Sequence, residues 1–138
     1  MLEESSLNVF VYGTLKPGEC NHEPYCGAKA IAITKAYAKG VLFDLPTLGY
    51  PAMIEGEGKV QGFLLKFPDW SVLTLLDSLE GYDPMRSPSQ NEYQRQKITV
   101  YTPSGEAIEE VWAYLMAHEK VKQLGGIWLP SGVWSKEA

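Results

Sequence analysis

The sequence predicts an α+β domain built on a small, curved or closed β-sheet, and three observations support this. Segments rich in β-forming residues dominate the chain, short corners marked by glycine and proline join them, and only one stretch has helical spacing. Strands and helices do not alternate regularly, as they would in a doubly wound α/β fold. We therefore expect a sheet with an inserted helix.

The first strand is expected over residues 7–12, a short apolar run of β-forming residues. It ends at Gly13. The loop over residues 13–18 contains two glycines and one proline, so its backbone is expected to follow an unusual path. Residues 28–45 favour a bent strand, or two strands, interrupted at Gly40.

Two turns and a further strand are predicted in the middle of the chain. Residues 49–51 and 55–58 are rich in glycine or proline and read as turns. Residues 59–67 predict a strand, in which Gly62 indicates a bulge or a close approach of another backbone.

One helix is predicted after this strand. Large apolar residues recur at every third position, at Trp70, Leu73, Leu76 and Leu79. Asp69 suits the N-cap of this helix, and Gly81 suits the position just after its C-terminus. Glu80 therefore lies in the last turn.

A β-hairpin is predicted next. Residues 93–102 and 108–116 are rich in β-forming residues and flank a Pro-Ser-Gly turn. From about residue 117 the chain shows no clear pattern. Trp128 and Trp134 in this tail would either cover the barrel end or form an exposed apolar patch.

The composition is that of one globular domain. The chain has 138 residues, of which 45% are hydrophobic and 21% charged, so residues 1–138 can bury one core. The net charge of −5 argues against nucleic-acid binding, which depends largely on Lys and Arg contacts to phosphates.

The sequence indicates neither a membrane segment nor a metal site. No apolar run approaches the ~18 residues that span a bilayer, and the first residues are acidic where a signal peptide is basic. Cys20 and Cys26 flank His22, but a fourth ligand is missing, so two reduced thiols are the simpler interpretation. We expect a cytoplasmic protein without a metal or cofactor.

The loop over residues 13–18 is the first candidate for a functional role. A glycine-rich turn after a buried strand can direct successive backbone N–H groups into one space and bind an anion. The glycine spacing matches neither a P-loop nor a dinucleotide-binding fingerprint. An ordinary tight loop is the alternative.

Glu80 is the second candidate. An acid in the last turn of a helix faces the negative end of the helix dipole, which disfavours the charged form. A carboxyl group with a raised pKa is suited to proton transfer. The alternative is a solvated surface glutamate, and Asp77, three residues earlier, is interpreted as a surface or supporting group.

The third candidate lies in the predicted hairpin. Tyr93 and Arg95 would share one face of a strand, and an inward-facing arginine needs a carboxylate partner. That partner is either a structural acid or an anionic substrate. Tyr114, in the paired strand, would direct its hydroxyl into the same interior or serve as an aromatic core residue.

In their order along the chain, these motifs resemble the γ-glutamyl cyclotransferase-like family. Residues 9–18 (VFVYGTLKPG) are similar to its Tyr-Gly-Ser/Thr-Leu signature, and residues 50–52 (YPA) to its Tyr-Pro-Ala stretch. Residues 76–82 (LDSLEGY) resemble its Leu-Asp-x-x-Glu-Gly segment, 93–95 (YQR) its Tyr-x-Arg, and 111–114 (VWAY) its final strand. The loop up to Asn21 and His22 also resembles the branch that acts on γ-glutamylamines.

The resemblance implies a small closed or strongly curved, mostly antiparallel β-barrel with flanking helices. It also implies an enzyme, in which the α-amine of a γ-glutamyl substrate attacks its own γ-amide carbonyl, giving 5-oxoproline and a free amine. The family's functional residues carry over by motif. Glu80 would be the acid/base, Arg95 and Tyr93 would support the pocket, and the substrate would contact Tyr12, Gly13, Thr14, Leu15 and Tyr114.

Two other functions fit the same residues. The first is a non-catalytic module that binds a small carboxylate-bearing metabolite, because a fold does not determine a function. The second is an enzyme that removes a γ-glutamyl protecting group from a carrier protein or an unusual amine. The sequence specifies neither the leaving amine nor the oligomeric state.

Overall fold

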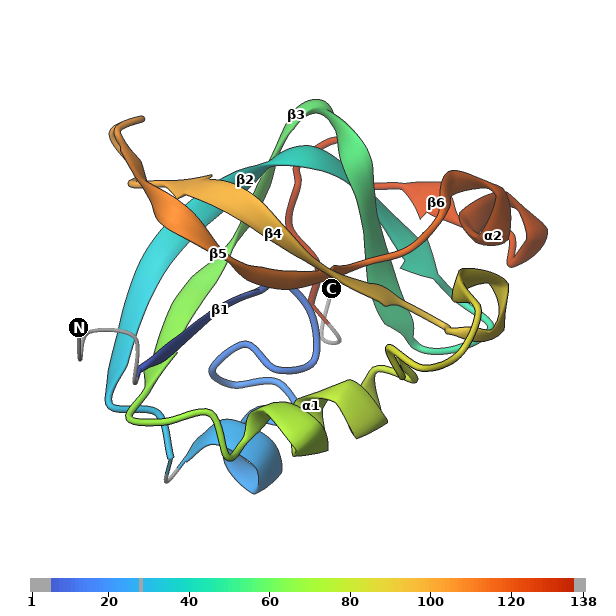
Figure 1. Cartoon of the computed structure of the whole chain (residues 1–138). Coiled ribbons are helices and arrows are strands. Elements are labelled where there is room, and N and C mark those ends of the chain that lie inside the picture. The colour runs from blue at the N-terminus through green and yellow to red at the C-terminus, as the bar shows by residue number, and fades with distance from the viewer. Residues whose placement is uncertain (1–5, 28, 136–138) are drawn as a thin grey trace.

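A computed structural model describes residues 6–27 and 29–135 of the chain. Five strands close into a barrel in the order β3–β1–β5–β4–β2, and β2 pairs back to β3 (Figure 1). The strands are β1 (Leu7–Val11), β2 (Ala32–Leu45), β3 (Tyr50–Phe67), β4 (Gln94–Tyr101) and β5 (Ala107–Leu115). Among the strands of residues 6–27 and 29–135, only β1 and β5 are parallel neighbours, so the mostly antiparallel barrel is confirmed.

Strand β1 is buried on both faces, which explains its continuous apolar sequence. Leu7 and Val9 pack in a cluster that also contains Leu76 of the helix. Phe10, with its side chain on the other face, packs in a second cluster formed by residues of all five barrel strands. The first cluster therefore lies between barrel and helix, and the second fills the barrel.

The two turns predicted in the middle of the chain have different outcomes. Gly49 does lie in a turn, between β2 and β3: its φ is +81° and its N–H donates to Leu45 O at 2.9 Å, whereas residues 50–51 already begin β3.

The turn predicted at residues 55–58 is wrong, because these residues stay within β3, which pairs with β2 along most of its length. The register shifts between Lys39 and Val41, opposite residues 55–58, so these glycine-rich residues form an irregularity rather than a chain reversal. The expected interruption at Gly40 falls at this shift.

The close backbone approach predicted at Gly62 is confirmed. A Cβ atom at this position would lie 2.2 Å from the carbonyl oxygen of Val11 and 2.8 Å from the ring of Phe10. Only glycine lets β3 pass this close to β1.

The helix α1 (Leu73–Leu79) begins later than predicted. Asp69 is not its N-cap, because its Oδ1 accepts a hydrogen bond from the Ser71 N–H, 2.9 Å away, and so stabilises a turn before the helix. Trp70 therefore lies outside α1 and is 43% exposed. The helix runs beneath the barrel, beside the short helical segment Glu23–Gly27 (Figure 1).

The C-terminus of α1 is as predicted. Gly81 has φ of +66°, a conformation that favours glycine. Its N–H donates to Ser78 O (3.2 Å), and the Tyr82 N–H donates to Asp77 O (2.9 Å). These two bonds define a Schellman motif and fix the direction in which the chain leaves Glu80.

The described part of the C-terminal segment, residues 117–135, packs against the barrel. It contains α2 (His118–Gln123) and β6 (Ile127–Trp128), which pairs with β2. Trp134 is buried and its Nε1–H donates to Asp44 Oδ1 at 2.9 Å, whereas Trp128 is 60% exposed. The two tryptophans therefore do not form one patch.

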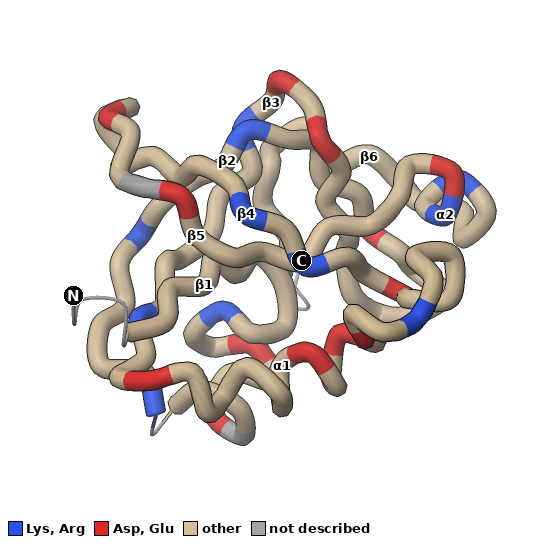
Figure 2. The backbone as a smooth tube through the Cα atoms, viewed as in Figure 1, with Lys and Arg blue, Asp and Glu red and all other residues tan. Residues whose placement is uncertain are grey.

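A short helix of one turn, Pro88–Gln90, lies in the loop between α1 and β4. None of the described helices is long and apolar enough to cross a bilayer. Figure 2 shows acidic residues along α1 and the loops around it, whereas Lys and Arg are spread over several elements.

Candidate active site

A pocket of about 100 Å³ opens between the end of β1, the start of β3 and the C-terminus of α1. Four groups of residues line it: 10–15 with Asn21; Tyr50 and Pro51; Leu79 and Glu80; and Glu92, Tyr93 and Tyr114. These groups come from most of the chain, so the pocket exists only when α1 has packed against the closed barrel.

Glu80 is the C-cap residue of α1, and its carboxyl group faces this pocket. No other described residue forms a hydrogen bond or ion pair with that carboxyl group. Burial, reinforced by the negative charge of Glu92, raises the pKa of Glu80 to about 8. The group therefore titrates near neutral pH, where a carboxyl group exchanges protons most effectively in catalysis.

Residues 13–15, which we call the donor loop, are held in place by hydrogen bonds that their carbonyl oxygens accept. Gly13 O accepts from the Lys16 N–H (3.0 Å), and Thr14 O from the Asn21 N–H (2.9 Å). Leu15 O lies 2.8 Å from His22 Nδ1, which must be the donor because a carbonyl only accepts. None of the three N–H groups of the donor loop bonds to another described residue, so they remain available to an anion.

The donor loop also packs closely against β3. A Cβ atom on Gly13 would lie 2.8 Å from Pro51 Cγ, so a larger residue would push the loop away from the pocket wall. The Asn21 side chain adds a further bond, from Nδ2 to Thr14 Oγ1 at 2.9 Å. His22, considered above between two cysteines, thus contacts the donor loop.

Three tyrosines form much of the pocket wall, and their hydroxyl groups bond to the protein. Tyr12 donates to Tyr114 O (2.6 Å) and accepts from the Met53 N–H (3.2 Å). Tyr93 donates to Pro51 O at 2.5 Å. Tyr114 donates to Asp77 Oδ1 at 2.6 Å. Burial raises the pKa of all three tyrosines, so they stay protonated.

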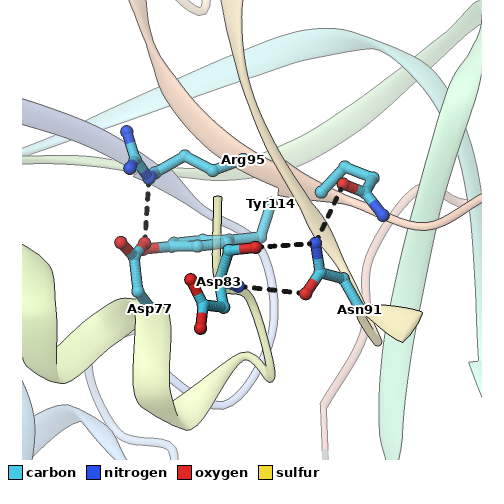
Figure 3. A network of polar contacts seen from close by, with 6 residues as sticks. Asp77, Asp83, Asn91, Arg95 and Tyr114 are labelled. Carbon is cyan, nitrogen blue, oxygen red and sulfur yellow. Dashed lines mark hydrogen bonds and ion pairs between the residues drawn. The ribbon is translucent and has the colours of Figure 1, made fainter. Parts of the chain in front are cut away.

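Arg95 pairs with a structural acid, one of the two alternatives that its position allowed. Its Nε lies 2.9 Å from Asp77 Oδ1, the oxygen that also accepts from Tyr114 (Figure 3). The guanidinium carbon lies 4.8 Å from the centre of the Trp112 ring. Asp77 is therefore not a free surface group. It connects α1 to β4 and β5 beside the pocket.

A second network holds the loop that follows α1. Asn91 Oδ1 accepts from the Asp83 N–H at 3.0 Å (Figure 3) and from Arg86 Nε at 2.9 Å. The Glu92 N–H donates to Gly81 O at 2.9 Å. This loop thus returns to the end of the helix, which brings Glu92 next to Glu80 in the pocket wall.

The comparison with known families gives a clear result. A model of the family described as gamma-glutamyl cyclotransferase, AIG2-like, matches residues 9–136 of this chain. The chain belongs to this family. A relative from Vibrio cholerae, named "Putative gamma-glutamylcyclotransferase", is 32% identical over 126 residues, which cover 91% of this chain and 93% of the relative.

Solved structures of similar proteins agree with the fold. An AIG2-like protein from Mus musculus matches with a TM-score of 0.72 and 22% identity, over 97% of this chain and 91% of that one. YkqA from Bacillus subtilis matches with a TM-score of 0.65 and 26% identity, over 94% of this chain. This chain spans only 39% of the length of YkqA.

Most of the residues predicted from the γ-glutamyl cyclotransferase-like motifs meet in the pocket. They are Tyr12, Gly13, Thr14, Leu15, Glu80, Tyr93 and Tyr114; Arg95 lies outside the lining. Tyr50 and Glu92 also line the pocket but were not predicted as site residues; Tyr50 belongs to the Tyr-Pro-Ala motif, and Glu92 directly precedes the Tyr-x-Arg motif. Tyr50 donates a hydrogen bond to Glu92 Oε2 across 42 positions of sequence, a pairing that no local pattern indicates.

Proposed function

We propose that this protein is a γ-glutamyl cyclotransferase-type enzyme that acts on a small γ-glutamyl amide. The substrate's α-amine attacks its own γ-carbonyl carbon, the γ-amide C–N bond breaks, and 5-oxoproline and a free amine leave. The observation that carries this proposal is Glu80, whose carboxyl group has a pKa of about 8 and no partner among the described residues. It lies in a pocket where the N–H groups of residues 13–15 also bond to none of them.

Glu80 is the proton carrier in this reaction. Its ionised form takes a proton from the substrate's α-ammonium group, which makes the amine nucleophilic. Its protonated form then gives that proton to the nitrogen of the departing amine as the γ-amide C–N bond breaks. The attacking nitrogen gives up its second proton through Glu80 to the released amine, which leaves as an ammonium ion, so the carboxyl group returns to its ionised starting state. A pKa near the working pH serves both steps, and such catalysis typically contributes about 10²–10⁴-fold.

The donor loop is proposed to hold the substrate's negative charge. The N–H groups of Gly13, Thr14 and Leu15 would bind the α-carboxylate or polarise the γ-carbonyl oxygen. The substrate supplies its own nucleophile, so folding the γ-glutamyl chain back on itself supplies several kcal/mol of the barrier reduction.

The aromatic wall is proposed to orient the substrate rather than to react with it. The hydroxyl groups of Tyr12 and Tyr114 bond to the protein, so these residues offer their rings to the substrate. Tyr93, itself part of the wall, is fixed by its bond to Pro51, and Arg95 supports the wall from outside the lining through Asp77.

The test is product formation by the purified protein. We would incubate it with a panel of γ-glutamyl amino acids, γ-glutamyl-ε-lysine and glutathione, and quantify 5-oxoproline by mass spectrometry. Glu80→Gln removes the titrating group with little change in shape, and Glu57→Gln makes the same chemical change at an exposed position.

Two results would separate the possible functions. Product that is lost in Glu80→Gln and retained in Glu57→Gln supports both the reaction and the role of Glu80. Retention of a γ-glutamyl compound without product would contradict catalysis and support a carboxylate-binding module on the same fold. Full activity of a folded Glu80→Gln variant would remove Glu80 from the mechanism.

A further inference from the structure

Residues 129–134, which we call the terminal loop, are attached to the barrel by backbone hydrogen bonds. The Leu129 N–H donates to a carbonyl oxygen of β2 at 2.8 Å, and the Gln61 N–H of β3 donates to Gly132 O at 2.8 Å. Gly132 has φ of +73°, and a Cβ atom there would lie 2.0 Å from Lys59 O, so only glycine lets the loop approach β3 this closely. The terminal loop therefore has a fixed path along β2 and β3.

Trp134 ends the terminal loop and contacts three other parts of the molecule. Its ring is buried in the cluster that fills the barrel, to which Tyr12 of the pocket wall also belongs. Its Nε1–H donates to Asp44 at the end of β2. Its carbonyl oxygen accepts a hydrogen bond from Lys16 Nζ, which places the terminal loop beside the loop that follows β1 (Figure 1). Trp134 thus links the barrel core to the residue directly after the donor loop.

Lys16 is a buried lysine that joins the terminal loop to the donor loop. It is 8% exposed, and its backbone N–H donates to Gly13 O at 3.0 Å. Hydrogen bonds among residues 13–22 shape the donor loop locally, whereas the Lys16 side chain attaches it to Trp134. Burial lowers the pKa of Lys16, and the negative charge of Glu19 opposes this change. Lysine side chains are seldom buried unless they are paired, and no described carboxylate forms an ion pair with this one.

The pocket also needs a positive charge that its lining does not provide. The proposed substrate brings an α-carboxylate, whereas Glu80 and Glu92 both line the pocket, and no Lys, Arg or His is among the described residues of the lining. Two acids in one small pocket disfavour a third carboxylate, because like charges repel. Lys16 follows the donor loop directly and lies outside the lining, so its charge can favour an anion on the loop without touching it.

We propose that Lys16, held by Trp134 O, is a positioning residue that adapts the donor loop to the α-carboxylate of the substrate. Its side-chain bond keeps the loop against the barrel, and its charge favours an anion on the three N–H groups of the loop. The inference rests on the proposed function, because it identifies what selects the γ-glutamyl end of the substrate. It also gives the terminal loop a part in substrate binding, although only Lys16 connects this loop to the donor loop.

The experiment compares two substrates that differ only at the α-carboxylate. The first is the best γ-glutamyl substrate of the panel above, and the second is the same compound with this carboxylate replaced by a carboxamide. Both keep the α-amine and the leaving amine, and they yield 5-oxoproline and its amide, which mass spectrometry separates. The ratio of their kcat/KM values is compared between proteins, so that the intrinsic difference in reactivity cancels.

Loss of the ammonium group should reduce this ratio. In Lys16→Met, which keeps a chain of similar length, the ratio should fall about tenfold, the size expected for one charge-assisted hydrogen bond. The fall should come from a higher KM for the carboxylate substrate, with a smaller change in kcat. Lys16→Arg keeps a cationic donor and should retain most of the ratio. Lys66→Met makes the same change in net charge at an exposed position and should leave the ratio unchanged.

A second pair of variants tests the link to the terminal loop. Gly132→Ala should displace this loop, because the position has a positive φ and no room for a Cβ atom. The ratio should fall as in Lys16→Met, and the double variant should lower it no further, because both changes break the same contact. Gly125→Ala is the control, since Gly125 has φ of +72° but no atom within 4 Å of an added Cβ. Gly132→Ala also provides the test if Lys16→Met does not fold.

The outcomes separate the two proposals. No cyclised product from any compound of the panel contradicts the proposed function. An unchanged ratio in a folded Lys16→Met variant overturns the inference about Lys16 and leaves the cyclotransferase proposal standing. An equal loss for both substrates also overturns it, because Lys16 would then stabilise the pocket without acting on the carboxylate. Additive losses in the double variant would show that the terminal loop does not act through Lys16.

Discussion

The two sides of the pocket differ in how they are built. The donor loop is held by hydrogen bonds from residues at most seven positions away in the sequence, namely Lys16, Asn21 and His22. The acid pair, Glu80 and Glu92, lies on two segments that a loop and the barrel bring together, through Gly81 and Tyr50. One side is thus a local structure and the other depends on tertiary contacts, so substitutions should affect them differently.

The largest effect is expected on the acid pair. Glu80→Gln should lower kcat by about 10²–10⁴-fold or more, because the proton carrier is lost, while the fold is kept. Steady-state kinetics with 5-oxoproline detection measures the first effect, and the thermal unfolding midpoint checks the second. A fall in the kcat of Glu80→Gln of less than tenfold would contradict this role of Glu80, because the donor loop alone would then support turnover.

The second-largest effect is expected for Asp77, which anchors α1, the helix that carries Glu80. Asp77→Asn leaves the guanidinium of Arg95 without a charged partner and weakens the bond from Tyr114. We expect a loss of about 2–3 kcal/mol in the free energy of unfolding, measured by urea denaturation. The exposed Asp69→Asn is the matched control. An unchanged unfolding free energy would show that Asp77 does not anchor α1.

A smaller effect is expected on the donor loop. His22→Ala removes the bond to Leu15 O, so the loop should hold its N–H groups less firmly. We expect KM to rise by about tenfold with a smaller change in kcat, as for the loss of one hydrogen bond to a binding element. His118→Ala, at an exposed position, serves as the control. A fall in kcat with unchanged KM would place His22 in the chemical step instead.

The smallest effect is a shift of the pH profile. The negative charge of Glu92 contributes to the raised pKa of Glu80, so Glu92→Gln should lower that pKa. If ionised Glu80 starts the reaction, kcat/KM rises with pH up to about 8, and the rise should move to lower pH in the variant. A profile with the same midpoint in both proteins would indicate that the two carboxyl groups do not interact.

Several elements of the fold were predictable because their signals are local. The helix end at Gly81, the close approach at Gly62 and the hairpin around the Pro-Ser-Gly turn each follow from the conformational range of glycine or from β-forming residues. The helix start was misplaced because Asp69 bonds to Ser71 instead of capping α1. The turn predicted at residues 55–58 was wrong because pairing with β2 on both sides of these residues keeps β3 continuous through them.

The sequence by itself determined the family, the order of the strands along the chain and the residues of the donor loop, since these depend on motifs and short-range geometry. Only the tertiary structure decided that Arg95 pairs with Asp77, that Tyr50 holds Glu92, and that Glu92 stands beside Glu80. These contacts join residues up to 42 positions apart. They exist because the closed barrel and the turn at Gly81 bring distant segments together, and no local pattern encodes such a distance.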